Sequence, residues 1–249
     1  MFSYLWKAPT VLYPKRSKER KQFLRHKTKE LSSLLCSTSV TQRYYLSFEN
    51  YIDNDILPTS EELAAQVFIT EEERTQYLNK FSPPEFAIAI HPYSTHDTKV
   101  WPPEYWEELV HLLHKQKYQV IILGKSDTVF SSPYIPLEYN YTNRTSIRES
   151  MVLLEHAKIL ITPDSGLLHL ATATKTPSVA IFGPTTKEWG FFPPPPSVVL
   201  EDTSLSCRPC SLHGNTPCPH SKDCLYNIEP QYVFYQVEQL LYKNRNIDK

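Results

Sequence analysis

The sequence predicts an α/β fold built around one parallel sheet, and two observations carry this prediction. From residue 86 onward, short apolar, β-branched runs alternate with amphipathic stretches of helical period. Such alternation is typical of a parallel sheet with helices packed on its faces. The clearest unit is residues 159–185, ILITPDSGLLHLATATKTPSVAIFGPT, which indicates strand, tight turn, helix, strand and turn in that order.

The region before this alternation is mostly helical. Residues 18–35 and 60–80 both have helical character, and within the second the capping box of residues 70–73 (TEEE) predicts a helix start at Glu71. Residues 82–84 (SPP) then interrupt the chain, so we expect a domain boundary there. The expected domains are residues 1–82, mostly helical and including a linker, and residues 83–249.

In the second domain the residue pattern predicts strands and helices in turn. We expect strands at residues 86–90, 118–123, 159–162, 178–182 and 198–200. We expect helices at residues 103–116, 146–157, 167–174 and 229–244. The helix near residue 146 opens with a second capping box, Ser-Ile-Arg-Glu.

Polar residues follow each of the first four strands, at the edge where a parallel sheet binds its ligands. These segments are residues 91–102, 124–127, 164–166 and 183–186. Each carries small, hydroxyl or charged side chains, and we expect them to converge on one cleft. The sequence contains neither G-x-G-x-x-G nor G-x-x-x-x-G-K-[ST], which argues against NAD binding and against a P-loop.

A phosphate site is expected where the helix of residues 167–174 begins. A helix that starts just past a strand directs unpaired N–H groups and the positive end of its dipole at one point. Asp164, Ser165 and Gly166 form that turn, and His169 lies one helical turn beyond Ser165. The alternative is that the turn only caps a buried β-α-β unit. The polar ends of the other strands favour the phosphate site.

Four further residues at these strand ends suit a phosphorylated ligand. Lys99 offers a flexible cation for a pyrophosphate, although it could also be an ordinary surface lysine. Ser94 and Thr95 can donate hydroxyl hydrogen bonds to phosphate or sugar. Asp127 can accept hydrogen bonds from ribose hydroxyls, or it stabilises a turn.

The overall charge indicates no polyanionic partner such as nucleic acid, because 26 Lys and Arg are balanced by 27 Asp and Glu. A local basic cluster consists of Lys15, Arg16, Lys18, Arg20, Lys21, Arg25, Lys27 and Lys29. This basic segment, residues 15–29, could contact an anionic membrane surface or acceptor, or form a solvated helix face. No apolar stretch reaches the ~20 residues that span a bilayer, and the N-terminus is a poor signal peptide. We therefore expect a cytoplasmic location, with peripheral contact at the inner membrane as an option.

Several segments, taken in order, resemble the heptosyltransferase family, glycosyltransferase family 9, of lipopolysaccharide core biosynthesis. They are HPYSTHDTKVWPPEYWEEL, ILGKSD, NYTNRTSIRE, ITPDSGLLHLATATKTPSVAIFGPT and the later cysteine segment. The D-[ST]-G-x-x-H-[LI]-A and F-G-P-T motifs at this spacing are the most specific. The resemblance is specific from residue 86 to the C-terminus and weaker over residues 13–46, which look like the end of the family's acceptor-side domain.

The resemblance implies a GT-B type α/β fold, with one complete Rossmann-like, nucleotide-sugar-binding domain and a helical remnant of the acceptor domain. The donor in the best-known members is ADP-heptose, and the acceptor is a lipopolysaccharide core. The donor-binding residues implied by the family's motifs are Ser94, Thr95, Lys99, Asp127, Thr145, Asp164, Ser165, Gly166, His169 and Thr185.

By this analogy, Lys99 and the backbone of Ser165 and Gly166 hold the diphosphate. Asp164 faces the donor sugar, and His169 supports the phosphate or the leaving group. Within the same set, the family's arrangement places Asp127 at the ribose and the backbone near Thr145 at the adenine, with Ser94 and Thr95 beside the diphosphate. The implied reaction is an inverting heptosyl or hexosyl transfer that requires no metal cofactor.

The chain also departs from the family's pattern. The family's acceptor-side domain begins with a strand and a glycine-containing loop that carries a general-base aspartate, and nothing before Phe86 supplies them. We expect that base to lie in a missing N-terminal part, and loss of a base typically costs about 10²–10⁴-fold in rate. The alternative function is therefore a nucleotide-sugar-binding module that is inactive or depends on a partner. Tyr93 and Asn143 stand where many relatives have glycine.

Four cysteines, Cys207, Cys210, Cys218 and Cys224, lie close together in the loop of residues 205–226. In a cytosolic protein this density suggests a structural zinc site more than disulfides, with His213 and His220 as spare ligands. The alternative is a set of reduced, buried thiols.

Overall fold

The computed structural model describes residues 11–51 and 56–247, with side chains described as far as residue 243. The chain divides into two compact units, Met1–Ala64 with Lys187–Phe192 and Ala65–Thr186 with Pro193–Lys249. The boundary that we expected after residue 82 lies instead at Ala64. The reason is that helix α5 (Glu71–Phe81) packs against α7 (Ile147–His156) of the second unit.

Three ion pairs fasten α5 to α7. They join Arg74 to Glu155, Arg148 to Glu73, and Lys80 to Glu149, at 2.8, 2.7 and 2.6 Å. Thr70 forms the expected capping box, so α5 begins at Glu71 as predicted. The helix expected to start at residue 60 does not form there. Residues 60–70 contain only one turn, which Thr59 and Glu62 close by mutual hydrogen bonds.

The first unit consists of short helices. They are α2 (Ser17–His26), α3 (Lys29–Cys36), α4 (Val40–Leu46) and the 3-10 helices η1 (Glu49–Tyr51) and η4 (Lys187–Trp189). The helix expected over residues 18–35 is split, because Lys27 is left-handed (φ 49°) and Thr28 caps α3. The described residues of this unit contain no strand.

Two buried arginines hold η4 to the helices of the first unit. Arg20 Nη2 and Arg43 Nη2 donate to the carbonyl oxygen of Trp189 at 2.9 and 3.0 Å. The ring of Phe23 packs edge-on against Trp189, with centroids 6.2 Å apart. Burial lowers the pKa of both arginines. Residues 187–192 therefore belong to this helical unit although they follow a strand of the sheet.

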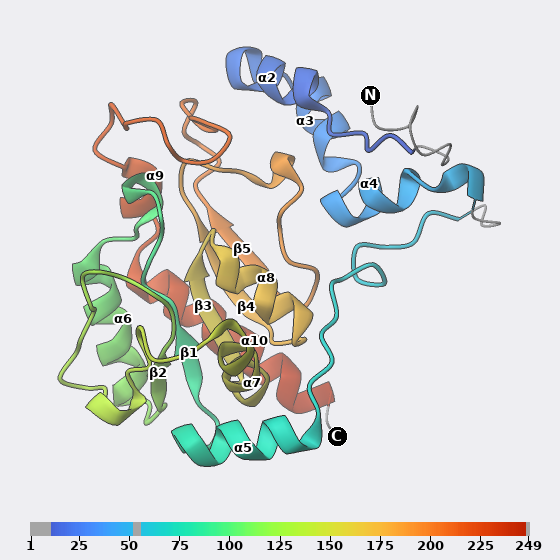
Figure 1. The fold of residues 1–249 in the computed structure, drawn as a ribbon. Helices are drawn as coiled ribbons and strands as arrows, with labels where there is room; N and C mark the ends of the chain where they lie inside the picture. Colours follow the sequence, from blue (N-terminus) through green and yellow to red (C-terminus); the bar gives the residue numbers. More distant parts are fainter. Residues whose placement is uncertain (1–10, 52–55, 248–249) are drawn as a thin grey trace. The chain divides into compact units, whose positions relative to one another are not determined.

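The second unit contains a five-stranded sheet whose strands are all parallel, in the order β2-β1-β3-β4-β5 (Figure 1). The strands are β1 (Ile88–Ile90), β2 (Val120–Ile122), β3 (Ile159–Pro163), β4 (Ser178–Phe182) and β5 (Val198–Glu201). All five lie where the residue pattern predicted them, so the α/β fold class is confirmed.

Helices cover both faces of this sheet. Besides α5 and α7 they are α6 (Pro103–Lys115), α8 (Gly166–Ala173), α9 (Asp223–Tyr226) and α10 (Pro230–Ile247), with the 3-10 helices η2 (Asp97–Lys99) and η3 (Leu137–Tyr139). Alternate residues of β1 face opposite cores. Ile88 and Ile90 pack with Trp106 of α6 and Val237 of α10, whereas Ala89 packs in the core that includes α7. The sheet is thus buried on both of its faces.

Candidate functional site

The strand order reverses direction between β1 and β3. The chain passes from β1 to β2 on one side of the sheet and then returns to form β3 on the other side of β1. Ile90 of β1 pairs in register with Ile161 of β3, so both strands end at the same edge. Connections that leave in opposite directions open a crevice at such a point, and open α/β sheets bind their ligands there.

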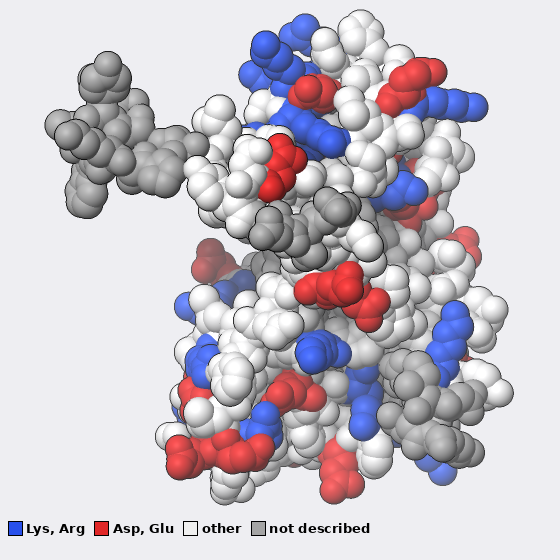
Figure 2. Space-filling model, turned by 90° about the vertical axis from the view of Figure 1, so that its right-hand side faces the viewer, with Lys and Arg blue, Asp and Glu red and all other residues white. Residues whose placement is uncertain are grey.

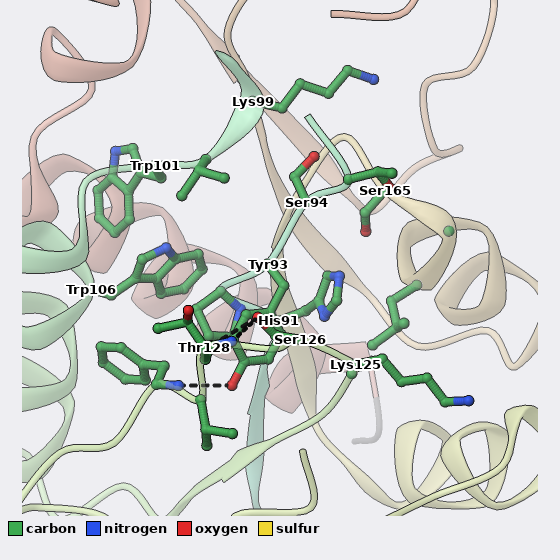
Figure 3. Close-up of a pocket in the computed structure, with 18 of the residues that line it drawn as sticks. His91, Tyr93, Ser94, Lys99, Trp101, Trp106, Lys125, Ser126, Thr128 and Ser165 are labelled. Atoms are coloured by element: carbon green, nitrogen blue, oxygen red, sulfur yellow. Dashed lines mark hydrogen bonds between the residues drawn. The ribbon is translucent and has the colours of Figure 1, made fainter. Parts of the chain in front are cut away.

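A pocket of about 1640 Å³ occupies this edge of the second unit (Figure 3). Its walls include nine of the ten predicted donor-site residues: Ser94, Thr95, Lys99, Asp127, Thr145, Asp164, Ser165, Gly166 and His169. The tenth, Thr185, is buried behind Asp164 and does not line the pocket. Three of the four predicted strand-end segments, residues 91–102, 124–127 and 164–166, therefore converge on this pocket, whereas residues 183–186 do not line it.

Asp164 is the centre of a small charged network at the end of β3. Lys99 Nζ donates to Asp164 Oδ2 at 2.6 Å, and Thr185 Oγ1 donates to the same oxygen at 2.7 Å. The side chains of Lys99 and Asp164 are only 13% and 16% exposed. Partial burial strengthens this pair relative to a surface ion pair, because less water screens it. The lysine is therefore held at the strand ends rather than in bulk solvent.

The N-terminus of α8 lies beside this network and has no side-chain cap. Ser165 occupies the N-cap position, but its side chain makes no capping hydrogen bond. Its hydroxyl pairs instead with Thr162 Oγ1 at 2.9 Å. Gly166 opens the helix, and a Cβ placed there would meet no atom within 4 Å. Ser165, Gly166 and Leu167 all line the pocket, so the uncapped first turn of α8 lies at its wall, and helix N-termini of this kind bind phosphate oxygens.

His169 stands one turn along α8, at the surface of the pocket. Its side chain is reached by solvent, but the pocket walls surround it, and this partial loss of water is the main cause of a lowered pKa. Lys99 lowers the pKa further, whereas Asp164 raises it. Neutral imidazole is therefore favoured, in which one ring nitrogen donates a hydrogen bond and the other accepts one.

The remaining predicted residues occupy the rest of the pocket wall. Ser94 is partly buried and its hydroxyl accepts a long hydrogen bond from His96 N, at 3.4 Å, whereas Thr95 and Asp127 are exposed. Thr145 is buried, and its hydroxyl pairs with that of Ser150 at 2.9 Å. Figure 3 shows Ser94 and Ser165 at the same end of the pocket as Lys99.

Tyr93 ties three loops together at the floor of the pocket, a role that the sequence did not reveal. Its hydroxyl accepts a hydrogen bond from Phe130 N at 3.1 Å and shares another with Thr142 Oγ1 at 2.7 Å. The side chain is only 7% exposed. The residue that replaces the family's usual glycine therefore fixes the loop of residues 125–131, which follows β2.

Asn143 fastens the same loop from a second side. Ser126 N donates to Asn143 Oδ1 at 3.0 Å, and Asn143 Nδ2 donates to the Ser126 carbonyl at 2.8 Å. Asn143 has a φ of 62°, which asparagine tolerates better than most residues. This mutual pairing explains how asparagine can stand at the other position where many relatives have glycine.

His91 forms the base of the crevice directly after β1. Its Nδ1 donates to the Leu123 carbonyl at 2.9 Å, and burial lowers its pKa despite that bond. Gly124 approaches so closely that a Cβ there would lie 2.4 Å from His91 Nδ1, and its φ is 130°. Only glycine fits at this turn after β2. The close approach joins the ends of β1 and β2 beneath the pocket.

The cysteine-rich loop of residues 205–226 contains free thiols. Cys224 is buried, and this burial raises its pKa to about 12, with smaller effects from the other three cysteines of the loop. The sulfur of Cys218 accepts hydrogen bonds of 3.4 Å from His220 N and Lys222 N. Among the described residues, no three His, Cys, Asp or Glu side chains come together in a way that could hold a metal ion. Structural zinc stays a prediction, which metal analysis of the purified chain tests.

Within the described part of the chain, no helix is both long enough and apolar enough to span a membrane.

Comparison with known proteins matches the part of the chain that contains the pocket. A model of glycosyltransferase family 9 (heptosyltransferase) matches residues 12–213. Lipopolysaccharide heptosyltransferase 2 of Escherichia coli strain K12 is 26% identical over 217 residues, which cover 79% of this chain and 62% of that protein.

Two solved structures resemble the chain in fold. The ADP-heptose lipopolysaccharide heptosyltransferase II of E. coli has a TM-score of 0.58 at 23% identity, over 84% of this chain and 63% of that one. A glycosyltransferase of family 9 from Veillonella parvula has a TM-score of 0.62 at 20% identity, over 83% and 61%. These structures confirm the expected GT-B type fold class. The chain spans less than two thirds of the length of each of these relatives.

Proposed function

Because the chain belongs to glycosyltransferase family 9, the heptosyltransferases, we propose that its second unit binds the nucleotide-sugar donor of a heptosyl transfer. The E. coli relative is named for ADP-heptose and for lipopolysaccharide. The proposed donor is accordingly ADP-heptose or a close analogue, and the proposed acceptor is a lipopolysaccharide core.

One observation carries this proposal, namely the Lys99–Asp164 ion pair beside the uncapped N-terminus of α8. A cation and a set of free N–H groups at a topological switch point suit a diphosphate. An acidic group next to them suits the hydroxyls of the attached sugar. The pocket of about 1640 Å³ exceeds the 300–1,000 Å³ of common ligand sites and leaves room for a nucleotide with a sugar.

In the proposed reaction an acceptor hydroxyl oxygen attacks the anomeric carbon of the donor sugar, and the bond from that carbon to the diphosphate breaks. The proton of the hydroxyl passes to a base, and ADP leaves with the bonding electrons. Lys99 and the N–H groups of α8 stabilise the charge that develops on ADP. Asp164 accepts hydrogen bonds from the sugar. We assign none of the described residues as the base.

Binding of the diphosphate changes the partners of Lys99. The phosphate oxygens compete with the Asp164 carboxylate for the same ammonium group, and they offer a larger negative charge. Asp164 is then free to turn to the sugar while Thr185 still donates to it. His169 lies next to both groups and can donate a hydrogen bond to the leaving phosphate.

The basic segment of residues 15–29 is the proposed contact with an anionic acceptor or with the cytoplasmic face of the inner membrane. Five of its basic side chains are exposed: Lys15, Lys18, Lys21, Arg25 and Lys29. Arg20 is buried and belongs to the interior of the first unit. Figure 2 shows blue side chains over α2, at the top of that view. Flotation with anionic and with neutral vesicles tests this contact, which requires binding to the anionic vesicles alone.

Turnover of the full chain tests the proposed function. The chain is incubated with ADP-heptose and a heptose-deficient lipopolysaccharide core, and ADP release is measured together with the mass of the acceptor. We expect ADP release matched by the addition of one heptose. Donor binding without transfer would instead support the partner-dependent binding module, and absence of both would contradict either function.

A further inference from the structure

The cysteine-rich loop of residues 205–226 packs directly on the residue that is expected to hold the diphosphate. A Cβ built on Gly214 would lie 2.7 Å from Lys99 Cε and 3.0 Å from Lys99 Cγ. The Thr98 hydroxyl donates to the Gly214 carbonyl oxygen. His213, the neighbour of Gly214, lines the same pocket. The loop is thus a wall of the site and not a distant appendage.

Gly214 is held firmly in this position. Its N–H donates to the buried Ser211 hydroxyl at 2.7 Å, and its φ of 82° is one that other residues rarely adopt. A second contact between the loop and the segment after β1 is the ion pair of Lys222 with Asp97, at 2.7 Å. Gly214 therefore presents its backbone to the stem of Lys99 from a fixed distance.

The same loop also forms hydrogen bonds to the turn that contains Thr185. Arg208 is buried and donates from Nη2 to the carbonyl oxygens of Phe182 and Thr185, at 3.2 and 3.0 Å. Cys210 N donates to the Pro184 carbonyl at 3.0 Å. Lys99 and Thr185 both donate hydrogen bonds to Asp164. The cysteine-rich loop thus contacts the segments that contain these two donors.

From these contacts we propose that the cysteine-rich loop positions the donor site, and that Gly214 is the positioning residue that directs Lys99 toward the diphosphate. This inference rests on the proposed function. The three atoms nearest to a Cβ at Gly214 all belong to the aliphatic stem of Lys99, so Gly214 would act on the site through that lysine. A side chain at residue 214 would displace the stem and move the ammonium away from the strand ends.

Calorimetric titration of the full chain with ADP tests this role. The variant Gly214→Ala should bind ADP at least tenfold more weakly than the unchanged chain, and Gly214→Asn should do the same. Asparagine tolerates a positive φ, so its effect isolates the added side chain from backbone strain. Asn215→Ala, an exposed neighbour, is the matched control and should bind ADP as the unchanged chain does.

A double variant separates positioning from general damage to the fold. In the Lys99→Ala background, Gly214→Ala should change ADP affinity by less than twofold, because the group that it displaces is gone. An equal loss in both backgrounds would show damage that does not pass through Lys99 and would overturn the inference. If Gly214→Ala fails to fold, Thr98→Val, which removes the hydroxyl bonded to the Gly214 carbonyl, should still weaken ADP binding.

The outcomes also separate this inference from the proposed function. An unchanged chain that binds ADP, with Gly214 variants that bind it equally well, overturns only the positioning role. An unchanged chain that binds no ADP overturns the proposed function, and the role of Gly214 falls with it.

Discussion

Lys99 and Asp164 form an ion pair of 2.6 Å that joins the loop after β1 to the turn after β3, across the switch point of the sheet. The pair lies 65 residues apart in sequence, and parallel pairing of the two strands brings it together. Without a ligand, the Asp164 carboxylate is paired with the Lys99 ammonium group, which is the group that a diphosphate would bind. This competition leads to a prediction that differs for binding and for transfer.

Asp164→Asn should separate the two activities. Loss of the carboxylate charge frees Lys99, so ADP should bind no more weakly than to the unchanged chain, and about threefold or more tightly if the competition costs ~0.7 kcal/mol. Heptosyl transfer should fall, because the acceptor for the sugar hydroxyls is weakened. Calorimetry with ADP and an assay of ADP release measure the two effects. Asp223→Asn, an exposed aspartate, is the control. Weaker ADP binding by Asp164→Asn would contradict the competition.

Tyr93→Phe should loosen the nucleoside end of the pocket. The change removes two hydrogen bonds that tie Phe130 and Thr142 to the loop after β1. Each is worth roughly 1 kcal/mol, so we expect lower thermal stability and weaker binding of AMP and of ADP by a similar factor, of about tenfold. Phe keeps the ring, so the core packing is preserved. An effect on ADP alone would show that Tyr93 acts at the diphosphate instead.

Stability at low pH should depend on Glu73. Hydrogen bonds from Arg148 and from Thr70 N lower the pKa of Glu73 from 4.5 to about 2. The folded chain therefore keeps this carboxylate ionised at pH values where the unfolded chain protonates it. The pairing of Glu73 with Arg148 contributes stability to the folded chain above about pH 4.5, and this contribution is lost as the pH falls toward 2.

Glu73→Gln tests this dependence. The thermal midpoint of the variant should fall less steeply between pH 4.5 and pH 2 than that of the unchanged chain. Glu72→Gln, an exposed neighbour in α5, should follow the unchanged chain. Parallel curves for Glu73→Gln and the unchanged chain would contradict the assignment of Glu73.

The sheet of the second unit could be predicted from the sequence because each strand is a short apolar run bounded by turn residues. Helix starts at Glu71 and Ile147 were predicted well, since their capping boxes are local signals. The helix expected from residue 60 was wrong, because residues 60–63 form a single turn and the helix begins at Glu71, where its capping box lies. The split of residues 18–35 depends on the left-handed Lys27, which the sequence does not mark.

The gathering of the strand-end residues at one pocket could be predicted from the sequence, but the contacts among them could not. Polar strand ends identify Lys99 and Asp164, because parallel strands bring their ends to one edge. The roles of Tyr93 and Gly214 depend on side chains packed across loops that are 37 and 116 residues apart, and no local pattern reveals such distances. The place of residues 187–192 in the first unit was equally hidden, since it depends on two buried arginines.

The most direct test of the central claim is calorimetric titration of ADP into the full chain and into Lys99→Ala. Lys115→Ala, an exposed lysine at the end of α6, serves as the matched control. We expect one ADP bound per chain, with affinity at least tenfold weaker for Lys99→Ala, as loss of a charge-assisted hydrogen bond of about 1.5–3 kcal/mol predicts. Lys115→Ala should bind as the unchanged chain does. If Lys99→Ala binds ADP as tightly as the unchanged chain does, the assignment of this pocket as the diphosphate site is contradicted.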